Sequence, residues 1–281
     1  MVISASLRAL LSGERVAGSR LNSSLLGELL AEGLLLVDSH GSKKAYRARD
    51  VEALKRFLID KNESYRVLEV GTPDTRASMA TETGNSKLLM VRSCPGFPVN
   101  SYEPIDCFLN DKPFVINPQE GSFMYIADWE KFTIPKDVTV IGIENMENFR
   151  MIRHQKQFFD DYLRTHGLTS RVLFVSRYPQ SIDLKRWLTT IPNHYLHFGD
   201  FDLAGIHIYQ SEFRQYLGYS RSSFLIPDDI EFRLKTGSSK RFDEQCERYR
   251  GISSENHELQ ELINLICQYR KGYDQEGYIS R

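Results

Sequence analysis

Apolar and polar residues follow helical spacing in three stretches of the first sixty residues. The second stretch begins at Asn22, a residue type that caps helices, and ends at Gly33, which breaks them. The spacing predicts helices around residues 7–11, 22–32 and 51–59. The chain is therefore expected to open with a small helical domain.

The stretch between the second and third predicted helices has the pattern of a β-hairpin. An apolar run at residues 34–37 and a strand-compatible run at residues 44–48 flank turn-forming residues 38–42. Helices followed by such a hairpin predict a winged helix-turn-helix over residues 1–62. Its tip and return arm carry four basic residues, Lys43, Lys44, Arg47 and Arg49.

These basic residues make double-stranded DNA the expected partner of the hairpin, because lysine and arginine neutralise phosphates. The helix at residues 22–32 would then lie in a groove of the duplex. That helix carries Glu28 and Glu32 but no lysine or arginine, so a winged helix that binds protein remains an alternative. A hairpin whose charges are simply solvated is the other alternative.

Residues 63–120 hold short apolar runs separated by clusters of Gly, Pro, Asn and Thr, which predict a linker and a small strand-rich region. Residues 72–85 are polar and without hydrophobic periodicity, and are the best linker candidate. We assign no chemistry to the turn-rich loop at residues 93–98.

From residue 121 to 281, apolar runs alternate with stretches of helical spacing. The runs predict strands at residues 138–143, 171–176 and 194–198, and the first stretch between them predicts a helix of about twenty residues. Such alternation favours an α/β fold with a parallel sheet covered on both faces. Ligands of such sheets bind at the carboxyl ends of the strands.

Three acidic residues stand at the ends of these predicted strands. Glu144 follows the first strand, and Asp200 and Asp202 follow the third, two positions apart on an extended segment. Side chains two apart on an extended chain project to the same side, and hard divalent cations prefer carboxylate oxygens. The spacing leaves two interpretations open, a metal-binding cluster and ordinary loop residues.

These motifs resemble a known family. An apolar strand ending in Glu144, and a later strand ending in Asp200-Phe201-Asp202 before a Gly-containing helix start, are similar to the Toprim domain of topoisomerases, DnaG-type primases and old-family nucleases. The segment at residues 199–205 resembles the topoisomerase VI A subunit. It is more similar still to JetD, the nuclease subunit of Wadjet plasmid-defence systems, in which a winged helix also precedes Toprim.

The resemblance implies an activity and a set of site residues. The Asp-Gln-Glu sequence at residues 274–276 is similar to a terminal Gln-Glu element of the JetD-like subunits. By resemblance, Glu144, Asp200 and Asp202 would be catalytic and, with Glu276, would hold Mg²⁺ or Mn²⁺. The chain would then be an endonuclease that uses a metal-activated water. An SMC-like ATPase complex and a second copy of the chain are its further candidate partners.

Two other functions stay open. Topoisomerase VI and its relatives cleave DNA with a tyrosine of the winged helix, and residues 1–62 contain one tyrosine, Tyr46. Tyr46 falls on the predicted hairpin and not on a helix, so a metal-activated water is the preferred nucleophile. The second alternative is a non-catalytic DNA-binding regulator with a relic Toprim domain.

The overall charge gives no help to DNA binding, because 36 basic residues balance 37 acidic ones. Local basic residues near the carboxylates are candidates for following a phosphate backbone. Arg150 and Arg153 lie on the helix predicted after Glu144, and Lys240 and Arg241 lie in a Gly/Ser-rich segment. A solvated helix face is again the alternative.

Several classes are disfavoured by what the sequence lacks. It has no apolar run that could span a bilayer and no basic leader, which predicts a cytoplasmic protein without a membrane partner. Its four cysteines form no CxxC pair, against a structural zinc site, and it has no P-loop or GxSxG motif. The histidines near the aspartates, His194, His197 and His207, are expected in the core or at its rim.

Overall fold

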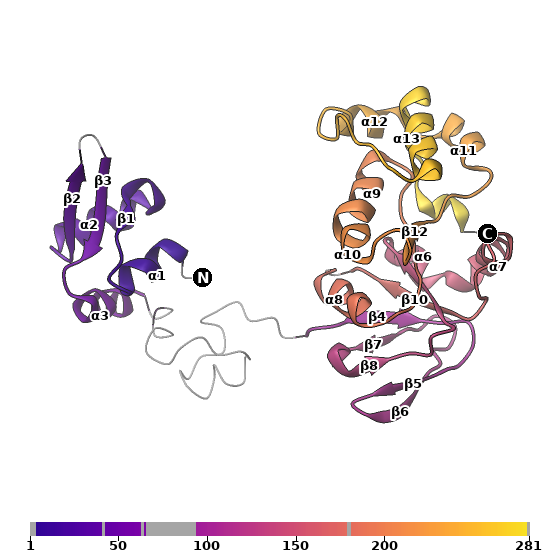
Figure 1. Ribbon diagram of the computed structural model, residues 1–281, viewed down its shortest axis with the longest axis horizontal. Coiled ribbons are helices and arrows are strands. Elements are labelled where there is room, and N and C mark those ends of the chain that lie inside the picture. The colour runs from indigo at the N-terminus through magenta and orange to yellow at the C-terminus, as the bar shows by residue number, and fades with distance from the viewer. Residues whose placement is uncertain (1–3, 41–42, 63–64, 66–93, 179–180, 280–281) are drawn as a thin grey trace. The chain divides into compact units, whose positions relative to one another are not determined.

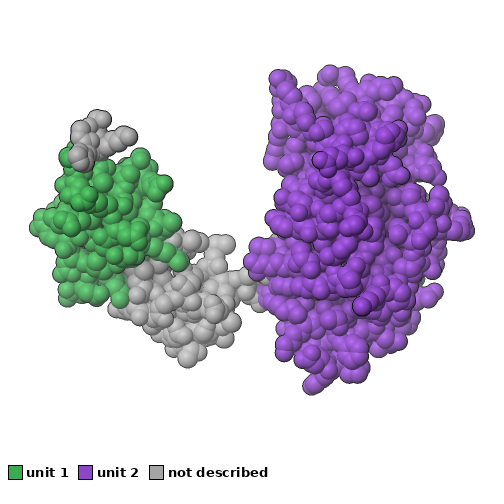
Figure 2. Space-filling model, viewed as in Figure 1, with its two compact units in different colours: residues 1–93 green, residues 94–281 purple. Residues whose placement is uncertain are grey.

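The computed structural model describes residues 4–40, 43–62, 65, 94–178 and 181–279. The chain divides into two compact units, Met1–Ser93 and Cys94–Arg281, which Figure 2 colours separately. The second unit begins well before residue 121, because strand β4 (Phe97–Asn100) pairs into its main sheet. The linker expected at residues 72–85 lies outside the described residues.

Three helices and a three-stranded antiparallel sheet of order β1-β3-β2 build the first unit (Figure 1). Its elements are α1 (Ala5–Leu11), β1 (Val16–Ala17), α2 (Ser23–Ala31), β2 (Leu35–His40), β3 (Lys43–Ala48) and α3 (Val51–Lys61). The helices and the β2–β3 hairpin lie where the sequence predicts them. The two-residue strand β1 escapes prediction because so short a segment shows no periodicity.

Capping side chains and leucine packing account for these elements. The Asn22 side chain accepts hydrogen bonds from the backbone N–H groups of Ser24 and Leu25, at 3.0 and 3.1 Å, and Asp50 begins α3 in the same way. Fully buried leucines from the three helices form the centre of the core, Leu10, Leu29, Leu54 and Leu58.

A six-stranded, mostly parallel sheet of order β12-β11-β9-β10-β4-β7 forms the centre of the second unit. Its parallel strands are β9 (Thr139–Ile143), β10 (Val172–Ser176), β11 (Tyr195–Phe198) and β12 (Ser222–Phe224). Strand β4 pairs antiparallel with both β10 and β7 (Met124–Ile126). The α/β class and the parallel sheet expected from sequence are thus confirmed, in a sheet with more strands than predicted.

A second, three-stranded sheet of order β6-β5-β8 precedes the parallel strands in the chain. It contains β5 (Ile105–Leu109), β6 (Lys112–Ile116) and β8 (Phe132–Thr133). The β5–β6 hairpin turns at Asn110 and Asp111, which both have positive φ, as the tight turns favoured between antiparallel strands require.

Helices follow each parallel strand of the main sheet. They are α6 (Met146–Arg150), α7 (Lys156–Thr165), α8 (Ile182–Thr190), α9 (Leu203–Ile208), α10 (Gln215–Leu217), α11 (Ile230–Thr236), α12 (Ser239–Gln245) and α13 (His257–Tyr269). Right-handed crossovers place α7 and α8 on opposite faces of the sheet, as Figure 1 shows. The sheet is therefore covered on both sides.

The single twenty-residue helix predicted after Glu144 is wrong. A 3-10 turn (Ile152–Gln155) separates α6 from α7. The buried Gln155 side chain donates to the backbone carbonyl oxygens of Asn148 and Met151, at 2.9 and 3.1 Å, and so takes acceptors that a continuous helix would use. The helical spacing of apolar residues continues across the break, so the sequence pattern does not reveal where α6 ends and α7 begins.

Candidate functional site

The order of the strands brings the predicted carboxylates to one crevice. Strands β9 and β11 are parallel neighbours in which Ile143 pairs with Phe198, and the Glu144 N–H donates to the Phe198 carbonyl oxygen at 3.2 Å. The chain leaves β9 toward α6 and leaves β11 toward α9, on opposite faces of the sheet. Such a divergence opens a crevice outside the carboxyl ends of the strands, where α/β proteins bind ligands.

The two aspartates after β11 flank a buried anchor. Phe201 is fully buried and forms an antiparallel bridge with Tyr273, so Asp200 and Asp202 project together to the side opposite Phe201, where Asp202 is also buried. Asp202 is itself the N-cap of α9, because its Oδ1 accepts from the Gly205 N–H at 2.8 Å. A Cβ at position 205 would stand 2.2 Å from the Asp200 carbonyl oxygen, so this turn requires glycine.

The C-terminal segment completes the crevice. The Phe201–Tyr273 bridge places residues 274–276 next to the two aspartates. The buried Gln275 donates its backbone N–H to Asp200 Oδ1 at 3.1 Å. Asn145, next to Glu144, donates its side-chain amide to Glu276 Oε1 at 2.5 Å. The four acidic residues named from the sequence thus stand on two strand ends and one C-terminal turn that contact each other.

One arginine pairs with three aspartates in this crevice, and these aspartates with Glu144 and Glu276 form the carboxylate cluster. Arg241 Nη1, from α12, lies 2.9 Å from Asp200 Oδ2, 3.2 Å from Asp202 Oδ2 and 2.7 Å from Asp274 Oδ1. The Arg241 side chain is 32% exposed, whereas that of Asp202 is 3% exposed. Arg241 is therefore bound to carboxylates and is not a loose basic residue of a surface loop, as the sequence suggested.

Glu144 is held from the other side by a buried histidine. His197 Nε2 lies 3.0 Å from Glu144 Oε1, and His197 Nδ1 lies 2.9 Å from the Tyr195 hydroxyl. His197 is 1% exposed. A Cβ at Gly199 would stand 3.0 Å from the Glu144 carboxyl carbon, so the glycine leaves room for this pair. His197 and the half-buried His194 lie in the core or at its rim as expected, whereas His207 is exposed.

The cluster carries more negative charge than Arg241 can neutralise. Burial, together with the charges of Asp200 and Asp274, raises the pKa of the Glu276 carboxyl. Burial raises the pKa of Asp274 as well, although Arg241 opposes the change. Glu276 Oε2 is buried and has no hydrogen-bond partner within the described part of the chain. A further cation would stabilise the charged forms of these carboxyls and would give Glu276 Oε2 a partner.

The carboxylates do not form a finished metal site in this arrangement. Among the described residues, no group of three His, Cys, Asp or Glu side chains is placed to hold a metal ion. The donor set is nevertheless the hard oxygen set that Mg²⁺ and Mn²⁺ prefer. Arg241 Nη1 lies within 3.2 Å of one oxygen from each of three aspartates of this donor set.

The basic residues singled out from sequence have different surroundings. Arg150 is exposed at the end of α6, but Arg153 donates to the backbone carbonyl oxygens of Tyr102 and Pro118, at 3.4 and 3.2 Å. The break after α6 separates Arg150 from Arg153, so they do not share a face of one helix. Lys240 is 86% exposed, beside Glu244.

In the first unit, the hairpin presents part of the expected basic surface. Lys44, Arg47 and Arg49 are exposed, and Arg47 lies 3.9 Å from Asp38, while the side chain of Lys43 lies outside the described residues. Tyr46 is 7% exposed and belongs to the core of this unit. A buried phenol cannot reach a DNA backbone, which counts against Tyr46 as a nucleophile.

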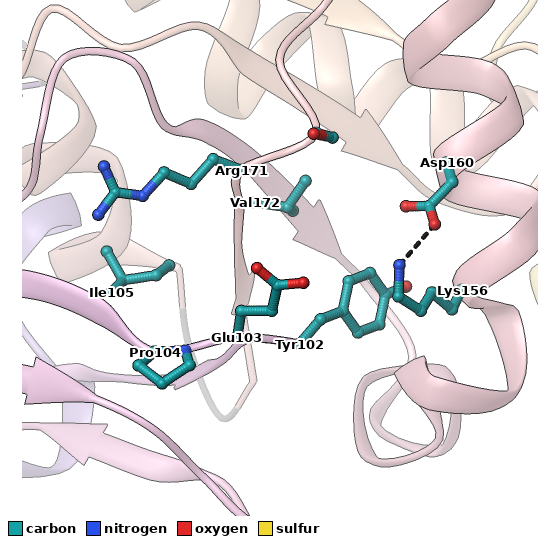
Figure 3. Close-up of a pocket in the computed structure, with 9 residues that line it drawn as sticks. Tyr102, Glu103, Pro104, Ile105, Lys156, Asp160, Arg171 and Val172 are labelled. Atoms are coloured by element: carbon teal, nitrogen blue, oxygen red, sulfur yellow. Dashed lines mark hydrogen bonds and ion pairs between the residues drawn. The ribbon is translucent and has the colours of Figure 1, made fainter.

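A cavity lies elsewhere, at the amino end of β10. It has a volume of about 380 Å³, and Figure 3 shows Glu103, Lys156, Asp160 and Arg171 around it. Lys156 pairs with Asp160 at 2.6 Å, and Arg171 pairs with Asp137 at 3.2 Å. Each cation already has an acidic neighbour, so this cavity offers little to an anionic ligand.

Comparison with known proteins gives a family for this chain. Residues 116–281 match a family described as a domain of unknown function, DUF7281. The chain belongs to the DUF7281 family. The DUF7281 region contains Glu144, the two aspartates, Arg241 and the C-terminal Glu276. Comparison with curated proteins finds no match. Within the described residues, no helix of this DUF7281 protein is long and apolar enough to cross a membrane.

Sequence reasoning missed three partners of the cluster. Asp274 was visible only as part of a C-terminal motif, and Arg241 only as a basic residue. Gln245 donates to Asp202 Oδ2 at 2.8 Å and accepts from the Ala204 N–H at 3.1 Å. Four residues, one α-helical turn, separate Arg241 from Gln245, and this shared face of α12 is the one signal that could have paired them.

Proposed function

We propose that this DUF7281 protein is a metal-dependent endonuclease of the Toprim type that cleaves phosphodiester bonds of double-stranded DNA. One observation carries the proposal: Asp200 and Asp202, from the end of β11, meet Glu276 and Asp274 beside Glu144 at the carboxyl ends of adjacent parallel strands. The resemblance of the same segments to Toprim nucleases supplies the reaction class.

Glu144, Asp200, Asp202 and Glu276 are the residues that would hold Mg²⁺ or Mn²⁺. The oxygen donors and the buried, unsatisfied Glu276 Oε2 within the described structure fit such an ion. When bound, the metal would activate a water molecule and stabilise charge on the scissile phosphate.

The protein supplies orientation. Gln275 fixes Asp200 Oδ1, and the Gly205 N–H fixes Asp202 Oδ1, so hydrogen bonds orient both aspartates apart from their contacts with Arg241. His197 holds Glu144 Oε1 against the end of β9. Carboxylates held in this way lose little conformational entropy when they bind a ligand.

The first unit would hold the DNA. We propose that its hairpin is the wing of a winged helix-turn-helix whose exposed Lys44, Arg47 and Arg49 contact phosphates without reading sequence. An SMC-like ATPase complex of plasmid defence, or a second copy of the chain, would be the protein partner that the resemblance implies.

A plasmid-cleavage assay tests the activity. Supercoiled plasmid should be nicked or cut in Mn²⁺ or Mg²⁺ and left intact in EDTA, and Glu144→Gln and Asp200→Asn should be inactive. Asp243→Asn is the matched control, because Asp243 is an exposed carboxylate of α12 whose partner Arg270 lies outside the cluster. Cleavage that persists in EDTA would overturn the metal mechanism.

One observation favours a second candidate, a non-catalytic DNA-binding regulator. Arg241 already gives the carboxylates a cation, as would suit a site that has lost its metal. A regulator would bind DNA equally well in EDTA and would bind no Mn²⁺. Calorimetry with Mn²⁺ therefore separates the two functions without a nuclease assay.

A further inference from the structure

Arg241 contacts the cluster in the manner of a bound ion. All three of its carboxylate contacts, at 2.7 to 3.2 Å, are made by one nitrogen, Nη1. The carboxylates come from two segments far apart in the sequence, after β11 and before the C-terminus. A guanidinium usually pairs side-on with one carboxylate through two nitrogens. Here a single positive nitrogen sits where three oxygens meet.

Contacts other than those with Arg241 also hold the Asp200 and Asp202 carboxylates in position. Asp200 Oδ1 is held by the Gln275 N–H, and Asp202 Oδ1 by the Gly205 N–H. Gln245 supports Asp202 Oδ2 as well. The backbone therefore keeps these two carboxylates in place even if the arginine leaves.

The approach of Arg241 is built into the fold. A Cβ at Gly272 would stand 3.2 Å from Arg241 Cδ and 2.8 Å from Asp202 Cβ. The Ser238–Gly272 bridge fixes the start of α12 next to this glycine. The arginine thus reaches the carboxylates along a defined path, and its partly exposed side chain can return to solvent the same way.

We propose that Arg241 is a resident counter-ion of the carboxylate cluster and that a divalent metal binds by displacing it. This inference rests on the proposed metal-dependent function. Asp200 Oδ2 and Asp202 Oδ2 contact Nη1 and belong to two of the proposed metal ligands. A divalent ion would bind about 2.1 Å from these oxygens, close to the position of Nη1, and the two cations repel each other. Three aspartates against one arginine leave two negative charges, which favour an ion of charge +2 over the guanidinium.

Displacement links metal loading to DNA. The released guanidinium becomes a donor beside the crevice, and guanidinium binds phosphate with paired hydrogen bonds. DNA that accepts Arg241 would therefore favour metal binding, and metal would favour DNA binding by the same factor. Without either ligand, Arg241 would keep the site closed to stray cations.

Calorimetric titration of the full chain with Mn²⁺, without DNA, tests the displacement. Arg241→Gln should bind Mn²⁺ at least about tenfold more tightly than the wild type, since no resident cation competes. Lys240→Gln is the matched control: it removes the same charge from the neighbouring position of α12, where the side chain is 86% exposed, and should change affinity by less than about twofold.

The outcomes separate this inference from the proposed function. Equal or weaker Mn²⁺ binding by Arg241→Gln, with binding kept by the wild type, overturns the displacement and leaves the metal site standing. No Mn²⁺ binding by either protein overturns both. Should Arg241→Gln fail to fold, the wild type still decides. Saturation with Mg²⁺ should shift one guanidinium signal in the arginine side-chain NMR spectrum, and an unchanged spectrum overturns the displacement.

Discussion

The two ends of the central sheet differ in how they arrange charge. At the amino end, a cavity of about 380 Å³ is lined by cations with local partners, such as Lys156 with Asp160 four residues later. At the carboxyl end, three aspartates from distant segments share Arg241, and Glu144 shares a buried histidine. The cations of the cavity at the amino end thus have local acidic partners, whereas the crevice at the carboxyl end has excess negative charge.

This difference agrees with the function proposed for the carboxyl end. Surface pairs four residues apart on a helix contribute little energy and form wherever lysine and aspartate have that spacing. Bringing several carboxylates together costs free energy, which proteins tolerate mainly where a ligand or reaction uses it.

The largest expected effect compares one carboxylate from each end. Asp202→Asn should reduce plasmid cleavage in Mn²⁺ by more than about 100-fold, because a neutral amide cannot replace a charged metal ligand. Asparagine keeps the Oδ1 acceptor for the Gly205 N–H, so α9 remains capped. Asp160→Asn, at the amino end, should leave cleavage within about twofold. Equal losses in the two variants would refute the comparison.

A second test separates the basic residues proposed to bind DNA from the carboxylates proposed to bind metal. Changing Lys44, Arg47 and Arg49 together to Ala should lower DNA affinity about tenfold at low salt and make its salt dependence shallower by about one unit per lost contact. Mn²⁺ affinity should not change. The double variant Arg164→Ala/Arg250→Ala, which removes exposed arginines of the second unit, is the control. An unaltered salt dependence would assign the hairpin to protein binding.

The sequence predicted those parts of the fold that local pattern controls. Capped helices such as α2, the hairpin, and β9, β10 and β11 follow directly from spacing and apolar runs. The split between α6 and α7 could not be predicted, because it depends on a buried contact between Asn148 and Gln155. Strand β4 is also invisible to local pattern, since its pairing with β10 joins residues about seventy positions apart.

The site was predictable as a set of acids but not as an arrangement. Glu144, Asp200 and Asp202 could be placed together because parallel strands end at one edge. Arg241 could not be assigned to them, because its contacts depend on how α12 packs after a bridge between Ser238 and Gly272. Position in the chain shows which residues carry charge, and only the packing shows which charges face each other.

A smaller effect is expected from the histidine beside Glu144. His197→Phe would leave the buried Tyr195 hydroxyl and Glu144 Oε1 without their partner, at a cost of about 1–3 kcal/mol in the free energy of unfolding. Mn²⁺ binding should weaken as Glu144 becomes less well positioned. His207→Phe, at an exposed position, should change stability by less than about 0.5 kcal/mol. Unchanged Mn²⁺ affinity in His197→Phe would show that Glu144 does not need this support.

The smallest expected effect contrasts how the two ends respond to acid. His194 precedes β11 at the amino end, and burial, together with the charge of Arg221, lowers its pKa below 6.5. The folded state therefore disfavours the proton, so stability present above pH 6.5 is lost as the pH falls toward the lowered pKa. The raised pKa values of Asp274 and Glu276 act in the opposite direction, at lower pH. We expect the free energy of unfolding, measured with urea, to fall between pH 7.5 and pH 5.5. The decrease should be up to about 1 kcal/mol larger for the wild type than for His194→Gln, after allowance for solvent screening. An equal decrease in the two proteins would mean that protonation of His194 does not contribute to the pH dependence of stability.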